Sequence, residues 1–523
     1  MKKLIALLLC LSVCLSVLSG CGGNSDEPYI PTGDALVMEG EDPDSVGPQK
    51  EEEPQELTLV YSPDKSMNPL EAADHNNRVL FSLIYQSLFN VDSECNPEPI
   101  LCRAFQSSAD GKTWTFYIEN HATFSDGTSL TIHDVLATYN AALESTYYKG
   151  RFTHVKEVAM TTDGGISFTL DTAYENFPQL LDVPILKSSQ VASDTPLGTG
   201  PYALSSSLSG AHLRKVPSWW CQEAEIVTTA DTISLIAAGN PAEVRDQFEF
   251  GDVGLVCADP CSDTHADFRC DYELWDIDNG VFLFIGCNVA WVDFLEEDDL
   301  RTMLTYGIDR QAIVDQFYNG YAQPTTLPVS PSSPYYSSSL AARYEYDSAK
   351  FVNFLSGYGK TKEPIRLLVN YDDSARVKVA RYIAETLTDF GLPTVTLEYN
   401  TQNYNAAYYA GNYDLYLGTT RLSPNMDLSA FFAPYGALSR NGISDPTTYS
   451  LCLESLANAG NYRNLHEQVA NEGRIIPIAF FRYSIYAVRG LMTDLSPARD
   501  NTFYYSLGKT MGEIQIPTDY SDE

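Results

Sequence analysis

The chain has 523 residues and a formal net charge of −36 at pH 7. So acidic a chain is not expected to bind nucleic acid, because phosphate recognition needs a basic stripe and the sequence shows none. Its length exceeds what one small hydrophobic core organises, so we expect two or three domains.

The N-terminus has the pattern of a secretory signal. Lys2 and Lys3 precede an uncharged run from Leu4 to Val17, and Leu18-Ser-Gly-Cys21 follows. A basic start, a short apolar core and small residues before a cut predict a signal peptide over residues 1–20 rather than a membrane span. The Leu-Ser-Gly-Cys ending resembles the lipobox of bacterial lipoproteins, which implies lipidation of Cys21. An ordinary signal peptide with a chance cysteine is the alternative.

Residues 21–56 differ in composition from the rest of the chain. From residue 22 they hold eleven Asp or Glu against one Lys, together with repeated Pro and Gly. Such a segment buries too little apolar surface to fold, and its like charges extend it. We expect an acidic, disordered tether that starts at lipidated Cys21. It would hold an extracytoplasmic body on the outer face of the bacterial cytoplasmic membrane.

The first part of the body alternates strands and helices. Period-2 alternation predicts strands, and apolar residues on one helical face predict helices. The expected elements are a strand at 56–61, a helix at 75–89, a strand at 113–118, a helix that Thr131 caps and that runs through Leu143, and a hairpin of 155–160 with 166–170.

Beyond residue 290 the order becomes strand, helix, strand, helix, strand, which is typical of a mainly parallel α/β sheet. The expected elements are a long helix 298–318, a helix capped by Asp347, a strand 365–370, a helix 374–390 stopped by Gly391, strands 395–399 and 413–417, and a final strand 475–486. The predicted fold class is therefore α/β.

Several short motifs follow one another along the body. They are Asn96-Pro-Glu-Pro-Ile-Leu101, Ser108-Ala-Asp-Gly-Lys-Thr-Trp114, Phe124-Ser-Asp-Gly127, Pro196-Leu-Gly-Thr-Gly-Pro-Tyr202, Leu300–Arg310 with its Ile-Asp-Arg ending, Asp347-Ser-Ala-Lys350 and Asn412-Tyr-Asp-Leu415. Their types and order resemble the family 5 extracellular solute-binding proteins, the oligopeptide, dipeptide and nickel receptors of ABC importers. The resemblance covers residues 57 to about 490.

The resemblance implies a two-lobed, periplasmic-binding-protein-like (type II) fold with an extra inserted domain and a ligand cleft between the lobes. Lobe I would combine residues 57–75, 190–287 and 476–523, the inserted domain would span 76–189, and lobe III would span 288–475. The implied function is capture of a peptide or peptide-like solute and its delivery to the transmembrane subunits of an ABC permease. We expect a monomer that uses no cofactor and no metal.

The segment that sets specificity in the family's peptide receptors departs here from their pattern. Those receptors pair an aspartate with the α-amino group of the peptide. In this chain the position holds Leu422 or Pro424, depending on the register, and Arg421 adds a positive charge. An Arg421 that faces the cleft suits a carboxylate, a phosphate or an anionic metal chelate; the alternatives are an exposed Arg421 or a pair with Asp427. Asp427 is also placed to take over the amine from a shifted position.

Candidate ligand-binding residues come from the end of the first strand, the crossing between the lobes and the segment 413–427. They are Tyr61, Ser62, Asn288, Tyr416, Thr419, Thr420, Arg421 and Asp427. Each is also compatible with a structural role.

Two other classes of protein compete with a transport receptor. A secreted hydrolase is disfavoured because the chain shows no His-Glu-x-x-His, Gly-x-Ser-x-Gly or P-loop motif, although acids are plentiful enough for a glycosidase-like pair. A lipoprotein that senses or scaffolds instead of transporting is the second alternative, which flanking permease genes would argue against.

Cys257, Cys261, His265 and Cys270 stand close together in an acidic stretch. Their spacing of three, three and four intervening residues is not the paired Cys-x-x-Cys of structural zinc. We expect a disulfide or free thiols in a surface loop, with metal binding as the minor alternative.

Overall fold

The computed structural model describes residues 56–71, 74–208, 210–262, 264–296, 298–358, 363–492 and 494–508. The predicted signal peptide, Cys21 and all of the predicted tether except Glu56 lie outside the described residues. No helix within these described ranges has the length and apolar character needed to cross a membrane.

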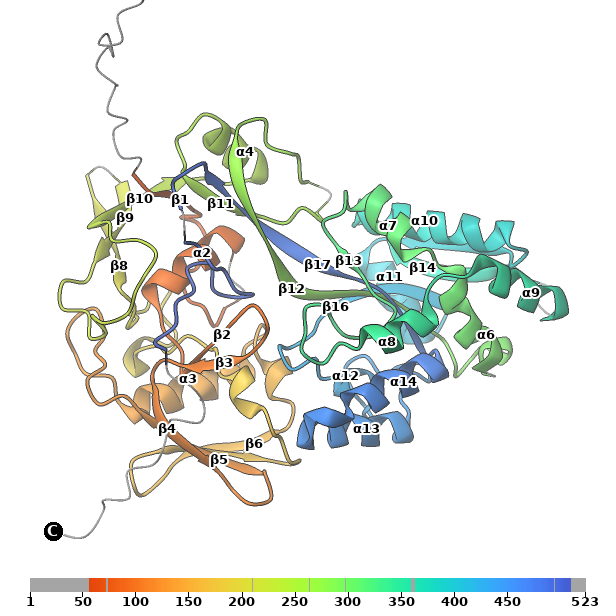
Figure 1. Ribbon diagram of the computed structural model, residues 1–523, viewed down its shortest axis with the longest axis horizontal. Coiled ribbons are helices and arrows are strands. Elements are labelled where there is room, and N and C mark those ends of the chain that lie inside the picture. Colours follow the sequence, from red (N-terminus) through yellow and green to blue (C-terminus); the bar gives the residue numbers. More distant parts are fainter. Residues whose placement is uncertain are drawn as a thin grey trace, which may run out of the picture. The chain divides into compact units, whose positions relative to one another are not determined.

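One mixed sheet runs through the described residues (Figure 1). Its strands lie in the order β15-β14-β16-β12-β17-β11-β1-β10-β9-β8, and β13 pairs with β17 off this path. Their bounds are β1 Thr58–Tyr61, β8 Tyr202–Ser207, β9 Gly210–Lys215, β10 Thr232–Ala237, β11 Leu255–Ala258, β12 Tyr272–Cys287, β13 Gln323–Pro324, β14 Ile365–Asn370, β15 Thr394–Tyr399, β16 Leu415–Arg421 and β17 Ile475–Val488.

The long strands β12 and β17 join the two parts of this sheet. They pair with each other antiparallel along most of their length, and the register shifts between Asp278 and Phe282. On one side β12 pairs with β16, and on the other β17 pairs with β11. The two strands therefore form the connection about which the parts of the fold would hinge.

Parallel pairing defines both parts of the sheet. On one side β14 runs parallel to β15 and β16, and on the other β1 runs parallel to β10 and β11. The predicted parallel α/β arrangement of residues 365–421 is thus confirmed. The carboxyl ends of β16 and β11 both point to the middle of the β12–β17 ladder, since Arg421 pairs with Val281 and Ala258 pairs with Ser484. Carboxyl ends of parallel strands are the usual place for ligands in α/β sheets.

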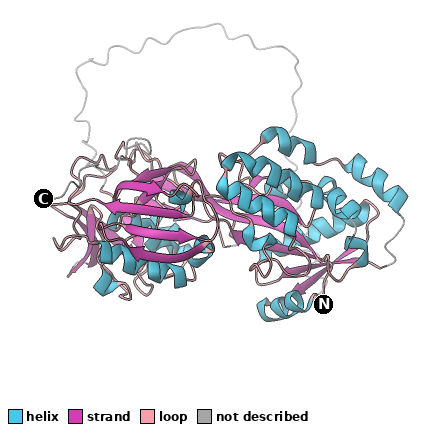
Figure 2. Ribbon diagram, turned by 90° about the horizontal axis from the view of Figure 1, so that it is seen from below, coloured by secondary structure: helices cyan, strands magenta, loops and turns pink. Residues whose placement is uncertain are grey.

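The helices are unevenly distributed between the two parts. Helices α5 to α14 accompany β14–β16, whereas the other part is richer in strands (Figure 2). Their bounds are α2 His75–Ile84, α3 Ile132–Glu144, α4 Pro241–Glu249, α5 Asp293–Glu296, α6 Asp298–Leu304, α7 Arg310–Phe317, α8 Ser338–Ala341, α9 Ser348–Tyr358, α10 Ser374–Asp389, α11 Thr401–Ala410, α12 Ser429–Phe432, α13 Pro446–Ala457 and α14 Tyr462–Glu472.

A separate antiparallel sheet, β4-β5-β7-β6, lies within the predicted inserted domain. Its strands are β4 Cys102–Ser107, β5 Thr113–Ile118, β6 Val155–Met160 and β7 Ile166–Leu170, and the pair β2 Phe89–Val91 with β3 Pro97–Pro99 lies beside it in sequence. The ring of Tyr139 on α3 packs edge-on against Phe168 on β7, with centroids 4.9 Å apart. The bounds of the three predicted domains remain predictions.

Most locally signalled elements form where they are predicted. Strands β5, β6 and β7 have the predicted bounds, and Thr131 and Asp134 form a capping box at the start of α3. The predicted long helix 298–318 is wrong, because the chain forms α6, a 3₁₀ turn at Thr305–Gly307 and then α7. The Phe351 ring packs against Gly307, and the Asp309 side chain accepts a hydrogen bond from the Ala312 N–H and starts a new helix. The predicted strand 413–417 also lies too early, since β16 spans Leu415–Arg421.

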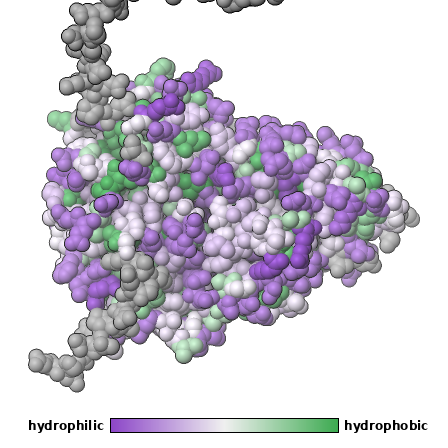
Figure 3. Space-filling model, viewed as in Figure 1, coloured by the Kyte–Doolittle hydropathy of each residue, from purple (hydrophilic) through white to green (hydrophobic). Residues whose placement is uncertain are grey.

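The surface of the described residues carries many polar side chains. On the face seen in Figure 3, hydrophilic residues are interspersed with small groups of apolar ones. This distribution is usual for a protein surface in contact with water.

Candidate functional site

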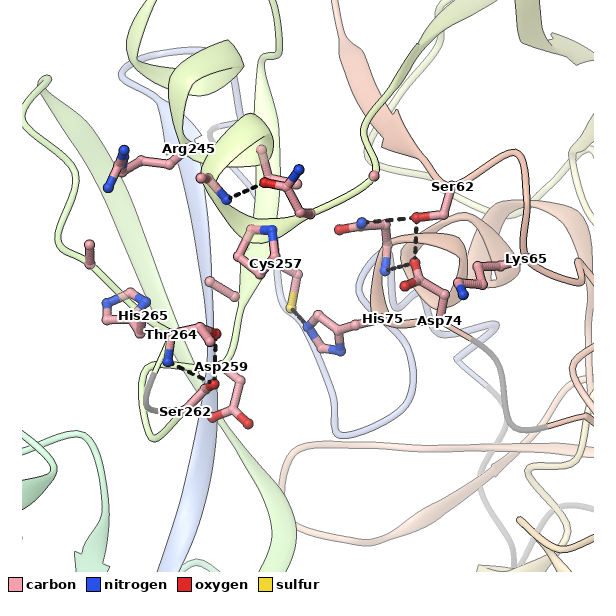
Figure 4. Close-up of a pocket in the computed structure, with 18 of the residues that line it drawn as sticks. Ser62, Lys65, Asp74, His75, Arg245, Cys257, Asp259, Ser262, Thr264 and His265 are labelled. Carbon is pink, nitrogen blue, oxygen red and sulfur yellow. Dashed lines mark hydrogen bonds between the residues drawn. The ribbon is translucent and has the colours of Figure 1, made fainter. Parts of the chain in front are cut away.

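A cavity of about 290 Å³ lies at the carboxyl ends of β1, β10 and β11 (Figure 4). We call it the main cavity; larger ones, of about 340 and 460 Å³, lie beside Asp276–Asp278 and along α10 and β15. Its walls come from three segments that follow these strands: Ser62, Asp64, Lys65 and Asp74–Asn76; Gly239–Ala242, Val244 and Arg245; and Cys257–Asp259, Ser262, Thr264–Ala266 and Phe268. Of the predicted ligand-binding residues, Ser62 lines this cavity and Tyr61 immediately precedes it on β1.

Two helices begin at the wall of the main cavity. Asp74 caps α2 by accepting hydrogen bonds from the N–H groups of Asn76 and Asn77, and Asn240 caps α4 through the N–H groups of Ala242 and Glu243. Ser62 donates its hydroxyl to Asp74 at 2.7 Å, so the end of β1 is tied to the start of α2. The N–H groups at both helix starts are thus satisfied by side chains of the wall, which also carries Asp64 and Asp259 beside Lys65 and Arg245.

His75 and Cys257 stand side by side in the wall of the main cavity (Figure 4). The Nε2 atom of His75 lies 3.0 Å from Sγ of Cys257. Burial, reinforced by the charge of Arg78, lowers the pKa of His75 to about 4. Burial also raises the pKa of the Cys257 thiol above its ordinary value. Both side chains are therefore neutral near pH 7. Burial raises the pKa of the neighbouring Asp259 to about 6.

A buried ion cluster lies next to this wall, centred on Asp500. Its carboxylate accepts hydrogen bonds from Arg78 at 2.9 Å, Arg151 at 3.0 Å and Arg421 at 2.8 Å. The Tyr147 ring packs against both Arg78 and Arg421, 4.1 Å and 5.2 Å from their guanidinium carbons. Burial opposes ionisation of Asp500, but the arginines outweigh it and hold its pKa well below the ordinary value. The cluster joins α2, the segment before β6, β16 and the C-terminal segment.

Arg421 is therefore neither exposed nor paired with Asp427. Besides Asp500, its guanidinium donates from Nε to the carbonyl of Asn279 at 2.9 Å and bonds the Tyr147 hydroxyl. The positive charge expected at this end of β16 is present, but Asp500 of the same chain already accepts a hydrogen bond from Arg421.

The position of the family's amine-binding aspartate lies beside Arg499. Leu422 is buried, and its carbonyl accepts a hydrogen bond from Arg499. Pro424 lines a cavity of about 40 Å³ together with Arg499 and Asp500. This cavity is lined by one arginine, Arg499, and by the carboxylates of Asp182 and Asp500.

Asp427 takes part in a network that joins the predicted inserted domain to the segment after β16. His154 lies 2.9 Å from Asp171 through Nδ1, and its Nε2 lies 3.3 Å from the Ser429 hydroxyl and 3.6 Å from Asp427. Ser429 also donates to Asp427 at 2.7 Å. Burial favours a neutral His154 ring, but Asp427 and Asp171 outweigh it and raise its pKa.

The His154 network predicts a pH-dependent stability. We expect His154→Gln to lower the free energy of unfolding by about 1.5–3 kcal/mol near pH 5.5. The pKa of His154 in the folded state exceeds its unfolded value of about 6.5. The loss of unfolding free energy should therefore be complete below about pH 6.5 and should disappear as the pH rises through the folded-state pKa. Urea unfolding at several pH values measures it. His133→Gln, on an exposed position of α3, is the control. A loss that grows with pH would contradict the assignment.

The remaining predicted residues do not line a cavity described here. Tyr416 is buried among aromatic rings, including Tyr408 and Tyr413. Thr419 accepts a hydrogen bond from Arg376 at 3.2 Å, and Thr420 pairs with Phe282 in the sheet. Asn288 is buried and donates to the carbonyls of Gly411 and Tyr413. These contacts position β16 and its neighbours.

The expectation of a surface loop is wrong for Cys257 and Cys261. Both are buried, Cys257 on β11 and Cys261 against the apolar core around β12 and β17, because the segment after β11 turns inward. No disulfide joins cysteines within the described ranges. Nor do the described residues place three or more His, Cys, Asp or Glu where they would hold a metal ion.

Comparison with known proteins yields matches by sequence and by fold. The model of the bacterial extracellular solute-binding proteins, family 5 Middle, matches residues 96–442. The glutathione-binding protein GsiB of Salmonella choleraesuis (strain SC-B67) is 23% identical over 359 residues, covering 64% of this chain and 68% of GsiB.

Two solved structures share the fold. The ABC transporter substrate-binding protein CtaP of Listeria monocytogenes has a TM-score of 0.70 at 18% identity and covers 86% of this chain and 97% of CtaP. AgaA of A. tumefaciens R10, in complex with agropinic acid, has a TM-score of 0.63 at 17% identity and covers 85% and 96% of the two chains. The two-lobed α/β fold expected from the sequence is thereby confirmed. Since the family model spans most of the body, this chain belongs to the family 5 bacterial extracellular solute-binding proteins.

Proposed function

We propose that the chain is the membrane-anchored solute receptor of an ABC importer and captures a peptide-like solute that carries a free carboxylate. The observation that carries this proposal is the main cavity, which lies at the carboxyl ends of β1, β10 and β11 and adjoins the arginines around Asp500. Cavities of a few hundred Å³ are typical of small-molecule sites.

The charges next to the cavity favour an anionic group over a bare amine. The family's amine-binding acid is absent from its position, and Arg499 donates a hydrogen bond to the carbonyl of Leu422 there. The named ligands of GsiB and AgaA, glutathione and agropinic acid, both carry acidic groups. A peptide-like solute with a free carboxylate therefore suits this chain better than one recognised mainly through its N-terminus.

Delivery to a permease would follow from closure about the β12–β17 connection. The main cavity is lined by the β1, β10 and β11 part of the sheet alone, so closure would have to bring residues of the β14–β16 part onto the bound solute. Those added contacts would stabilise the closed arrangement. The transmembrane subunits would then distinguish the closed, loaded receptor from the open one. We propose that the receptor acts as a monomer.

Isothermal titration calorimetry of the purified protein tests this function. The probes are glutathione, tri- and tetrapeptides with free carboxylates, and a nickel–histidine chelate. We expect saturable one-to-one binding of an acidic peptide without its conversion, as checked by mass spectrometry of the recovered probe. Turnover of the probe would instead indicate an enzyme, and selective binding of the chelate would assign the protein to metal uptake.

The proposed lipid anchor has its own test. Replacing Cys21 by Ser removes the thiol that would receive the diacylglyceryl group. We expect the protein to move almost entirely from the membrane fraction to the supernatant, because acyl chains supply the membrane affinity. Cys452→Ser, a buried position of α13, is the matched control and should leave the protein in the membrane fraction. Membrane retention of the Cys21→Ser variant would contradict the anchor.

A further inference from the structure

Two buried guanidinium groups line a small cavity next to the main one. This cavity has a volume of about 20 Å³, and its walls include His75, Arg78, Cys257, Arg499 and Asp500. Among the described residues, Nη1 of Arg78 and both Nε and Nη1 of Arg499 are buried without a hydrogen-bond partner. A buried donor without an acceptor costs about 1–3 kcal/mol, and more when its group is charged. These N–H groups therefore call for an acceptor; Arg78 lines this cavity, and Arg499 lines it as well as cavities of about 40 and 340 Å³.

Arg499 is held in this position by the fold. Its side chain is buried at 9% exposure, and Nη2 donates to the carbonyl of Leu422. Its guanidinium lies directly against Gly280, which has a φ of +72°, and a Cβ at that position would overlap the group. A glycine at a register shift of β12 thus makes room for Arg499, which cannot turn to solvent without losing these contacts.

The charges of this region do not balance. The carboxylates of Asp500 and Asp182 face four arginines: Arg78, Arg151, Arg421 and Arg499. Asp278 also faces Arg499, and it accepts hydrogen bonds from Ser330 and the Gly280 N–H. Even with Asp278 counted, one positive charge is uncompensated. A water molecule would satisfy the free N–H groups but not this charge, and buried charges require a partner of opposite sign.

The small cavity adjoins the main cavity at His75 and Cys257, which line both. Figure 4 shows these two side chains in contact between α2 and β11. Because both are neutral, separating them breaks no ion pair. Turning the His75 ring would connect the two spaces. The volume of about 20 Å³ suits one water-sized polar group, such as a carboxylate oxygen, better than a phosphate.

We propose that the cavity between Arg78 and Arg499 is a carboxylate subsite, which receives a carboxylate of the solute whose body lies in the main cavity. This assignment rests on the proposed function and names the chemical group that the receptor selects. Binding there pairs the uncompensated charge and supplies acceptors to both arginines.

The first experiment asks whether the subsite takes carboxylate at all. Thermal unfolding is followed in acetate and in acetamide, its neutral isostere, at constant ionic strength. We expect acetate alone to raise the Tm of the wild type, and Arg499→Gln to lose that response. Arg489→Gln, an exposed arginine directly after β17 and outside both cavities, should keep it. Equal effects of acetate and acetamide, or an unchanged response in Arg499→Gln, would overturn the proposal. If Arg499→Gln does not fold, Arg499→Lys and the wild-type comparison decide the question.

The second experiment asks whose carboxylate binds. Peptides with a free C-terminal carboxylate are titrated beside the same peptides with a C-terminal amide. For the wild type, we expect each amide to bind at least tenfold more weakly than the peptide with a free carboxylate. For Arg499→Gln, we expect the two forms to bind with equal affinity. Equal binding of both forms to the wild type, with an acetate response, would mean that a free anion occupies the subsite, and the proposal would be wrong. Neither form of any peptide could bind while acetate still raises the Tm of the wild type but not of Arg499→Gln. That result would support the carboxylate subsite and would show that the proposed peptide class of solute is wrong.

Discussion

Replacing Asp500 by Asn should lower the free energy of unfolding by about 3–5 kcal/mol, because it leaves buried guanidinium groups without their shared carboxylate. Arg78, Arg151 and Arg421 all donate to this side chain, and each comes from a different segment of the chain. Since the pKa of Asp500 lies well below its ordinary value, the stabilisation should persist through neutral pH and be lost only in strong acid. Denaturant unfolding at pH 7 measures the loss.

Asp64→Asn is the control for this change. Asp64 forms an exposed ion pair with Lys65 at 3.6 Å, and such pairs contribute about 0–1 kcal/mol. If Asp500→Asn cost no more than Asp64→Asn, the buried cluster would not stabilise the fold.

Replacing Gly280 by Ala should cost about 2–5 kcal/mol. An L-residue at a positive φ costs about 1–2 kcal/mol, and displacing a packed neighbour adds about 1–3 kcal/mol. The neighbour is the guanidinium of Arg499, so we also expect the acetate response of the protein to weaken. Denaturant unfolding and thermal shifts in acetate measure the two effects.

Gly127→Ala separates backbone strain from the clash. Gly127 has a φ of +82°, and a Cβ there would meet no atom within 4 Å. It should therefore show only the cost of the backbone conformation, about 1–2 kcal/mol. Equal losses in the two variants, with an unchanged acetate response in Gly280→Ala, would mean that Arg499 does not depend on this glycine.

Local signals in the sequence predict local structure well. The hairpin of β6 and β7 and the start of α3 depend on neighbouring residues, such as Thr131 with Asp134. The predicted helix 298–318 fails because its break depends partly on Phe351, a residue of another helix, against Gly307. Periodicity within one window carries no information about such a contact.

The site was less accessible to sequence reasoning because its partners are distant in the chain. Arg421 is 79 residues from Asp500, and Arg78 is 422 residues from it. The charge expected at Arg421 is present. No pattern in the sequence indicates that Asp500 compensates it, or that Nε and Nη1 of Arg499 have no acceptor. Ser62 could be proposed from its place at the end of the first strand. His75, Cys257 and Asn240 join it only because the sheet brings the ends of β1, β10 and β11 together.

The proposed place of the solute is the main cavity, at the carboxyl ends of β1, β10 and β11. Calorimetric titration of an acidic peptide into the wild type, Ala242→Trp and Ala237→Trp tests it most directly. Both alanines are exposed, but Ala242 lines the cavity and Ala237 does not. We expect Ala242→Trp to weaken binding at least tenfold and Ala237→Trp to bind like the wild type. Undiminished binding by a folded Ala242→Trp protein would contradict it.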